Sequence, residues 1–223
     1  MTTVVTSGLT TVGTLLDLLY TRLTLQDSPQ PADLIFVLAG RMDRKGYGIE
    51  LFRERLAPRL LLSVGRFEVS KMRTVDFAAT DELIGLRDRI PASERHFFCE
   101  MSAAGTRLAT PKLPQWNTYG EIVALREFLK GDMPRSVIFV STDVHLRRVA
   151  LTFGRVFRGL DVAARYCPVP LSFGSLERHE WWRRREDRQY VLTETIKLAA
   201  YGAILRLPDR MVRPIMRLRH LFH

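Results

Sequence analysis

Short, uninterrupted apolar runs recur along this chain, and segments with helical spacing separate them. Such runs are typical of β-strands that are buried on both faces of a parallel sheet. The runs cover residues 34–39, 59–64, 95–99 and 136–140, with a weaker one at 160–166, and helical spacing covers 48–56, 74–87, 119–129 and 146–157. The alternation predicts a three-layer α/β fold with a mostly parallel sheet.

A chain of 223 residues is long enough for one domain and short for two. We expect residues 1–31 to form an N-terminal amphipathic helix and a linker, residues 32–170 to form the core, and residues 171–223 to form a basic C-terminal helical region. The N-terminal helix is indicated by leucines at helical spacing, and the sequence Ser-Pro-Gln-Pro at 28–31 ends it. We therefore predict a single domain.

Charge and composition exclude several classes of protein. The net charge is +10, and most of it comes from residues 144–223, which hold 16 basic and 7 acidic side chains. No recognised nucleic-acid-binding motif accompanies this charge, so we do not expect nucleic acid as a partner. The two cysteines and the scattered histidines match no metal-ligand spacing, and we predict no metal. No secretory signal or membrane span is recognisable, and we expect a cytoplasmic protein, either free or peripheral at the membrane.

Residues that follow the strands are the candidates for a ligand site, because ligands of open α/β sheets bind at the carboxyl ends of the strands. Gly40 follows the first strand, where its backbone N–H group is available to an anion and the Arg41 guanidinium to a bidentate contact. The alternative is a tight turn that needs glycine. Ser63 and Gly65, with Arg66 after them, stand at the end of the second strand.

A long segment, residues 101–116, follows the third strand, and it is either a lid or an irregular surface insertion. Asn117, Thr118 and Glu121 come next. Thr118 and Glu121 have the spacing of a capping box, in which each side chain satisfies a free helix N–H group. That interpretation leaves Asn117 to orient a ligand or to brace the loop.

The stretch after the fourth strand, Ser-Thr-Asp-Val-His-Leu-Arg-Arg at 141–148, carries the most chemistry. If a helix starts near Asp143, His145 lies in its first turn and Arg148 lies three residues later on the same face. An imidazole and a guanidinium at a helix N-terminus suit a phosphate or a carboxylate, and His145 can also transfer a proton. Thr142 is a candidate ligand-binding residue, and Asp143 is a second candidate catalytic residue. The alternative is that Asp143 caps the helix while His145 and Arg148 are structural.

Taken in order, these segments resemble the YdcF/SanA/ElyC-like family. They are FVLAG at 36–40, LLLSVGR at 60–66, NTYGE at 117–121 and STDVHLRRV at 141–149, and the resemblance spans residues 33–170. It implies a Rossmann-like sheet and a pocket where the segments converge. It also implies S-adenosylmethionine as a candidate cofactor, from a cytosolic branch, and a link to cell-envelope or lipid-carrier metabolism, from membrane-anchored branches. The sequence departs from the family pattern at Ala39, Val64, Gly120 and Glu121.

The basic C-terminus offers a different kind of surface. Trp181 and Trp182 precede an expected helix over about 190–205, and they suit base stacking, a membrane interface or the closing of a core. Residues 206–223 read as a basic amphipathic helix that Pro214 would kink. Its apolar stripe contains Leu207, Met211, Ile215, Leu218 and Phe222, and its basic stripe contains Arg206, Arg210, Arg213 and Arg217. It suits docking on an anionic membrane, on a second subunit or on its own domain.

The function expected from these observations is binding of an anionic or nucleotide-like small molecule at the strand ends, either S-adenosylmethionine or a phosphorylated metabolite. Gly40, Arg41, Ser63, Gly65, Asn117, Thr118, Thr142 and Arg148 are the expected ligand-binding residues, and His145 and Asp143 are the expected catalytic residues. If the protein is an enzyme, it is a transferase or a hydrolase. The alternative is a non-catalytic ligand sensor or membrane-surface module that uses the C-terminal helix.

Overall fold

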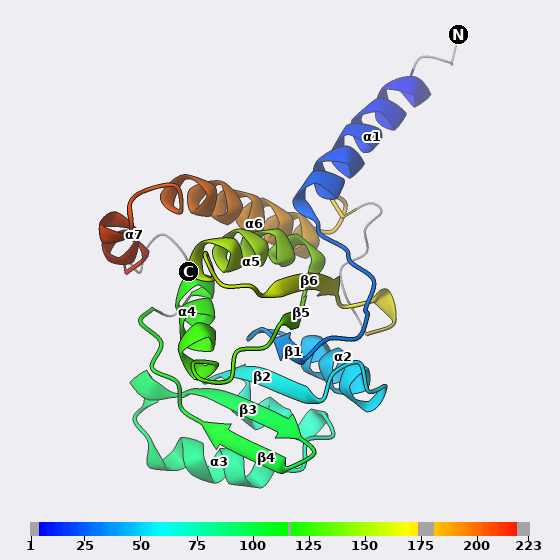
Figure 1. The fold of residues 1–223 in the computed structure, drawn as a ribbon. Coiled ribbons are helices and arrows are strands. Elements are labelled where there is room, and N and C mark those ends of the chain that lie inside the picture. Colours follow the sequence, from blue (N-terminus) through cyan, green and yellow to red (C-terminus); the bar gives the residue numbers. More distant parts are fainter. Residues whose placement is uncertain (1–4, 116, 174–180, 218–223) are drawn as a thin grey trace.

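The strands form one mixed sheet with helices on both faces (Figure 1). The computed structural model describes residues 5–115, 117–173 and 181–217. Within these ranges the strand order is β4-β3-β2-β1-β5-β6. The strands are β1 Leu34–Val37, β2 Arg59–Gly65, β3 His96–Ser102, β4 Gly105–Ala109, β5 Ser136–Ser141 and β6 Ala163–Pro168. The helices are α1 Val5–Leu23, α2 Met42–Arg53, α3 Thr80–Arg89, α4 Thr118–Phe128, α5 Asp143–Val156, α6 Arg185–Ile204 and α7 Asp209–Met216.

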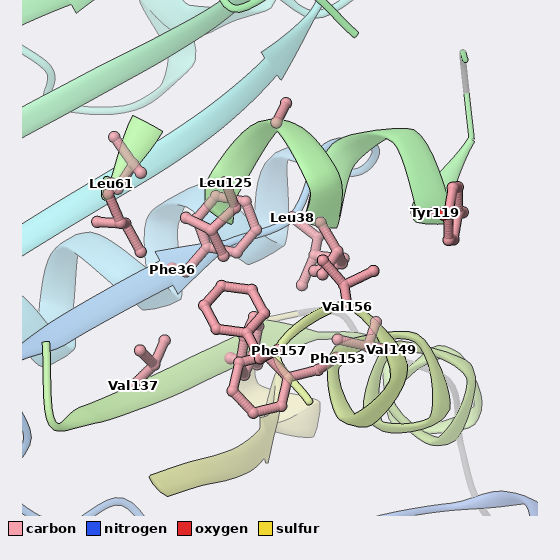
Figure 2. Packing of buried hydrophobic residues seen from close by; sticks show 14 of the residues in the cluster. Phe36, Leu38, Leu61, Tyr119, Leu125, Val137, Val149, Phe153, Val156 and Phe157 are labelled. Atoms are coloured by element: carbon pink, nitrogen blue, oxygen red, sulfur yellow. The ribbon is translucent and has the colours of Figure 1, made fainter. Parts of the chain in front are cut away.

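The predicted fold class is confirmed. Strand β1 pairs in parallel with both β2 and β5, and β5 pairs in parallel with β6. Residues 34–38, which are β1 and the residue after it, contribute alternately to two hydrophobic cores, one on each face of the sheet. Leu34, Phe36 and Leu38 enter the core beneath α4 and α5, shown in Figure 2, whereas Ile35 and Val37 enter the core beneath α2. A strand covered on both faces in this way has no polar side, which explains the continuous apolar run.

Strand β3 departs from the predicted direction, because it runs antiparallel to β2 and to β4. Residues 101–116, expected to be a lid or an irregular insertion, instead contain the end of β3 and all of β4, which form a hairpin. Gly105 has a φ of 111° at the start of β4, a conformation that favours glycine. The outer strand β4 has mostly exposed side chains and therefore lacks the apolar run that revealed the other strands.

The C-terminal region packs on the same core as the sheet. Tyr201, Val212 and Met216 are buried against the cluster that contains Phe36. The helix expected over 206–223 begins later than predicted, at Asp209 after Pro208, and the predicted apolar stripe is wrong because the buried residues of α7 are Val212 and Met216. The side chain of Met211 is 45% exposed. Leu218 and Phe222 lie outside the described residues.

The C-terminal end of α1 packs against the rest of the protein. Figure 1 shows the remainder of this helix projecting away from the sheet and the other helices. Tyr20 and Leu23 pack with Trp181, Val144 and Val191 in a separate apolar cluster. Trp181 is thus used to close a core, one of the three roles that its position suggested. None of the helices within the described ranges has both the length and the apolar character needed to cross a bilayer.

Candidate functional site

A pocket of about 580 Å³ lies at the carboxyl ends of the parallel strands. Its walls come from the segments after β1 and β2, from the start of β3, and from the first turns of α4 and α5. The chain order reverses between β1 and β5, the position at which α/β sheets open a crevice for ligands. The polar lining residues are Arg66, Glu68, Ser93, His96, Asn117, Thr118, Glu121 and His145.

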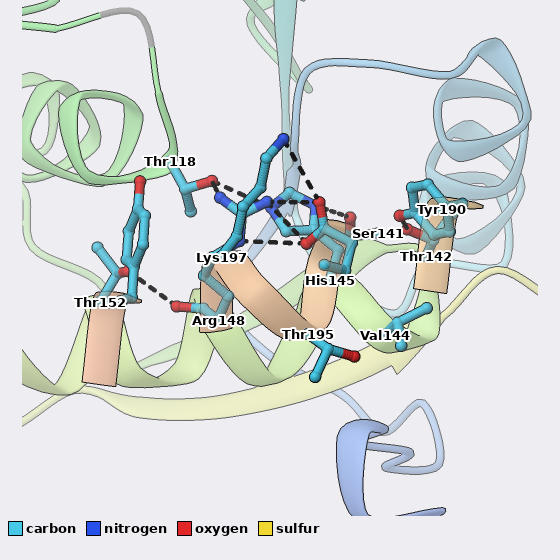
Figure 3. A network of polar contacts seen from close by, with 12 residues as sticks. Thr118, Ser141, Thr142, Val144, His145, Arg148, Thr152, Tyr190, Thr195 and Lys197 are labelled. Carbon is cyan, nitrogen blue, oxygen red and sulfur yellow. Dashed lines mark hydrogen bonds and ion pairs between the residues drawn. The ribbon is translucent and has the colours of Figure 1, made fainter. Parts of the chain in front are cut away.

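His145 is the centre of a hydrogen-bond network shown in Figure 3. Its Nδ1 atom lies 2.8 Å from Ser141 Oγ, and its Nε2 atom lies 3.1 Å from Thr118 Oγ1. The side chain is buried, and burial together with the positive charges of Arg148, Arg44 and Lys197 lowers its pKa well below the ordinary 6.5. The ring is therefore neutral at pH 7, and one of its nitrogens is an acceptor.

Arg148, predicted to bind an anion, is paired with a carboxylate of the protein itself. Its Nη2 atom lies 2.8 Å from Glu194 Oε2 and 3.0 Å from Oε1, and its Nε atom donates to Oε2 at 3.2 Å. Both side chains are 7% exposed. Nη1 of the same guanidinium donates to Thr118 Oγ1. Arg148 therefore fixes Thr118 and α6, and its charge is already balanced.

The backbone groups expected to receive an anion after β1 bind internal carboxylates. Gly40 N–H donates to Glu68 Oε1 at 2.6 Å, and Ala39 N–H donates to Glu121 Oε1 at 2.8 Å. Glu68 is in turn paired with the buried ammonium of Lys45 at 2.5 Å. Gly40 is still required, because its φ is 129° and an added Cβ would lie 2.8 Å from the Arg44 guanidinium.

The predicted capping box at α4 is wrong. Asn117 is the N-cap residue, and its Oδ1 accepts from Gly120 N–H at 3.0 Å. Glu121 reaches Ala39 instead of the helix end, and Thr118 reaches His145. Asn117 Nδ2 also donates to the carbonyl of Met216 at 3.1 Å, so this residue braces α7 while it lines the pocket.

Two of the expected residues, Arg41 and Asp143, are not part of the pocket lining. The Arg41 side chain is 53% exposed and pairs with Asp43, with Nε and Oδ2 2.8 Å apart. Asp143 accepts from the Tyr20 hydroxyl at 2.5 Å and so fastens α1. The N-cap residue of α5 is Thr142, whereas Asp143 is the first helical residue, in contrast to the alternative in which Asp143 caps the helix.

The remaining expected residues lie around or behind the pocket wall. Thr142 is buried, and its Oγ1 lies 2.5 Å from the Tyr190 hydroxyl and 3.1 Å from Arg44 Nη2. Gly65 lines the pocket, and an added Cβ there would lie 3.0 Å from Glu68 Oε1. Ser63 is fully buried, and its hydroxyl contacts a histidine that lines the pocket.

That histidine, His96, was missed by the sequence analysis. It is the first residue of β3 and stands opposite Gly65, and its Nε2 lies 2.8 Å from Ser63 Oγ. Burial lowers its pKa to about 4, although Glu68 acts in the opposite direction. A parallel third strand would have carried its first residue to the far edge of the sheet. The antiparallel direction of β3 brings His96 into the pocket.

The described part of the chain contains no group of three or more His, Cys, Asp or Glu side chains arranged to hold a metal ion. Comparison of the chain with protein-family models, with curated proteins and with solved structures found no match.

Proposed function

We propose that the protein is an enzyme, similar to the YdcF/SanA/ElyC-like family, that binds a nucleotide-like small molecule in the strand-end pocket. In this proposal it is a transferase or a hydrolase, and His145 moves the proton. The observation that carries the proposal is the contact between His145 Nε2 and the Thr118 hydroxyl at the pocket wall. A neutral imidazole within hydrogen-bond distance of a hydroxyl is the arrangement that general-base catalysis needs.

The charge of the lining favours one of the two expected ligand classes. Glu68 and Glu121 are carboxylates in the wall, and Arg66 is the arginine that lines it. Two of the buried cations behind the wall are paired, Arg148 with Glu194 and Lys45 with Glu68, and the second pair also balances the charge of Glu68. The guanidinium of Arg44 donates to the Ala39 carbonyl and to the Thr142 hydroxyl. Carboxylates repel phosphate groups and attract a cationic group. The Glu121 carboxylate in the lining suits a sulfonium, and on this ground we propose S-adenosylmethionine ahead of a phosphorylated metabolite.

The experiment is a titration of the purified protein with S-adenosylmethionine, a nucleotide and a short polyprenyl phosphate, followed by calorimetry and by the shift in Tm. We expect saturable binding of S-adenosylmethionine that weakens about tenfold or more in Glu121→Gln, since one opposed charge is removed. The matched control is Glu127→Gln, an exposed glutamate on the same helix. Binding of only the phosphorylated ligands would reject the methyl donor, and binding of none would reject the proposal.

In the described part of the C-terminal region, the buried apolar residues of α7 do not favour the membrane-surface alternative. Val212 and Met216 of α7 pack into the core beneath α5 and α6, so this apolar face is covered by the protein itself.

A further inference from the structure

We infer that Thr118 is the catalytic nucleophile of this pocket and that its hydroxyl attacks the carbonyl carbon of an uncharged carboxylic ester. The inference rests on the proposed function, in which the pocket is enzymatic and His145 is the base. The carrying observation is that Thr118 lines the pocket and that its Oγ1 lies within hydrogen-bond distance of both His145 Nε2 and the Arg148 guanidinium.

The imidazole of His145 is placed to accept the proton of the Thr118 hydroxyl. Thr118 Oγ1 and His145 Nε2 are 3.1 Å apart, and Ser141 Oγ lies 2.8 Å from the other ring nitrogen. When Nδ1 carries the ring proton and donates to Ser141, Nε2 accepts the proton of Thr118. A nucleophile, a base and a third group that orients the base form the pattern of covalent catalysis on unrelated folds.

The negative charge that develops on Thr118 has two sources of stabilisation. Arg148 Nη1 already donates to Oγ1, and Glu194 holds that guanidinium in place. Thr118 is also the first residue of α4, an 11-residue helix whose N-terminus carries partial positive charge. Both contributions are in place before the reaction, so little reorganisation is needed when the hydroxyl loses its proton.

The substrate class follows from the charges around the nucleophile. Transfer of a phosphoryl group needs several cations to clamp its oxygens. Arg148 and Lys45 are each paired with a carboxylate, which leaves Arg66 as the cation of the described pocket lining. The Glu121 carboxylate in the lining would in addition repel a phosphate, whereas the charge of Glu68 is balanced by Lys45. An ester carbonyl is uncharged and meets no such repulsion.

The reaction is balanced with water as the second substrate. Thr118 Oγ1 forms a bond to the carbonyl carbon while its proton passes to His145 Nε2. The bond from that carbon to the alcohol oxygen then breaks, and the alcohol leaves with the proton from His145. Water next attacks the acyl-threonine with His145 as base, which releases the acid and restores the Thr118 hydroxyl.

The test uses p-nitrophenyl acetate and p-nitrophenyl butyrate with the full-length protein, and mass spectrometry of the peptide that contains Thr118. We expect release of p-nitrophenol and one acyl group on Thr118 in the wild type. Thr118→Val and His145→Gln should lose at least 100-fold in turnover, since each removes part of the nucleophile and base pair. Thr118→Ser should retain the adduct and measurable turnover.

The matched control is Thr80→Val. Thr80 is also buried and is the first residue of a helix, α3, but its hydroxyl donates to the carbonyl of Phe77, at 2.6 Å. This variant should keep wild-type turnover and labelling. Circular dichroism of every variant separates loss of the nucleophile from loss of the fold, and Thr118→Ser keeps the test meaningful if Thr118→Val does not fold.

The outcomes distinguish this inference from the proposed function. Ester cleavage by Thr118→Val at the wild-type rate, or turnover without an acyl group on Thr118, overturns the nucleophile while ligand binding in the pocket still supports an enzyme. Cleavage of p-nitrophenyl phosphate in preference to the carboxylic esters overturns the substrate class. A wild type that cleaves no ester overturns the inference, and if it also binds none of the ligands in the titration, the proposed function fails with it.

Discussion

Two buried histidines give this site its electrostatic character. His96 and His145 are neutral at pH 7. Burial lowers the pKa of His96 more than Glu68 raises it, and burial together with the charges of Arg148, Arg44 and Lys197 lowers the pKa of His145. The folded protein therefore binds fewer protons than the unfolded chain once the pH falls below the ordinary pKa of 6.5. Their contribution to stability is full above that value and is lost as the pH falls towards the folded pKa, which for His96 is about 4.

For His96 alone, we predict a loss of about 2 kcal/mol in the free energy of unfolding between pH 7 and pH 5. The measurement is urea denaturation of the wild type and of His96→Gln at both pH values. The variant should lose less stability than the wild type on acidification, by about that amount. Equal losses in the two proteins would mean that His96 is not held neutral by the fold.

The residue types at the site were more predictable than their partners. His145, Thr118, Asn117 and Gly65 were expected near a ligand, and all four line the pocket. The partner of Arg148 is Glu194, which is 46 positions away and has no motif of its own. Sequence spacing predicts contacts within a helix or a turn, whereas a buried ion pair between two helices depends on their packing.

At the scale of secondary structure elements, α6 holds Arg148 in position through two of its side chains. Its Glu194 is the counter-ion of Arg148 on α5, and its Tyr201 ring lies 5.1 Å from the centre of that guanidinium. Loss of one partner would leave a charge buried without compensation, which costs more than the pair itself contributes.

We therefore predict that Glu194→Leu destabilises the protein by about 3–5 kcal/mol, and that adding Arg148→Met recovers part of the loss. Denaturant unfolding of the two single variants and of the double variant measures the coupling. Glu127→Gln, which alters an exposed pair with Lys130, should change stability by about 0.5 kcal/mol or less. A double variant that is no more stable than Glu194→Leu would show that the pair does not act as a unit.

The strands with apolar runs were recognisable, but the direction of one of them was not. An apolar run is the same whether a buried strand lies parallel or antiparallel to its neighbour. The direction of β3 is set by the hairpin with β4, whose side chains are mostly exposed and follow no clear pattern. The start of α7 was not recognisable from the sequence either. The helix begins after Pro208, and its buried residues are Val212 and Met216 instead of the predicted stripe.

At the scale of the whole molecule, the site is a consequence of sheet topology. Strands β1, β2 and β5 end at one edge, and the antiparallel β3 starts there, so side chains from distant parts of the sequence converge in one pocket. The order of strands and helices predicted that the residues after the parallel strands β1, β2 and β5 would lie close together. The internal carboxylates at Ala39 and Gly40 were not, because Glu68 and Glu121 reach these groups only through the tertiary fold.

The most direct test of the site is the protonation of His145, which joins α5 to Thr118 on α4. We would measure the ¹⁵N shifts of the histidine rings between pH 8 and pH 5.5, with His145→Gln to assign the signal. We predict a neutral ring throughout, with the proton on Nδ1 and an unprotonated Nε2 facing Thr118. A ring that is cationic at pH 7, or that carries its proton on Nε2, would contradict the role of His145 as the base of this pocket.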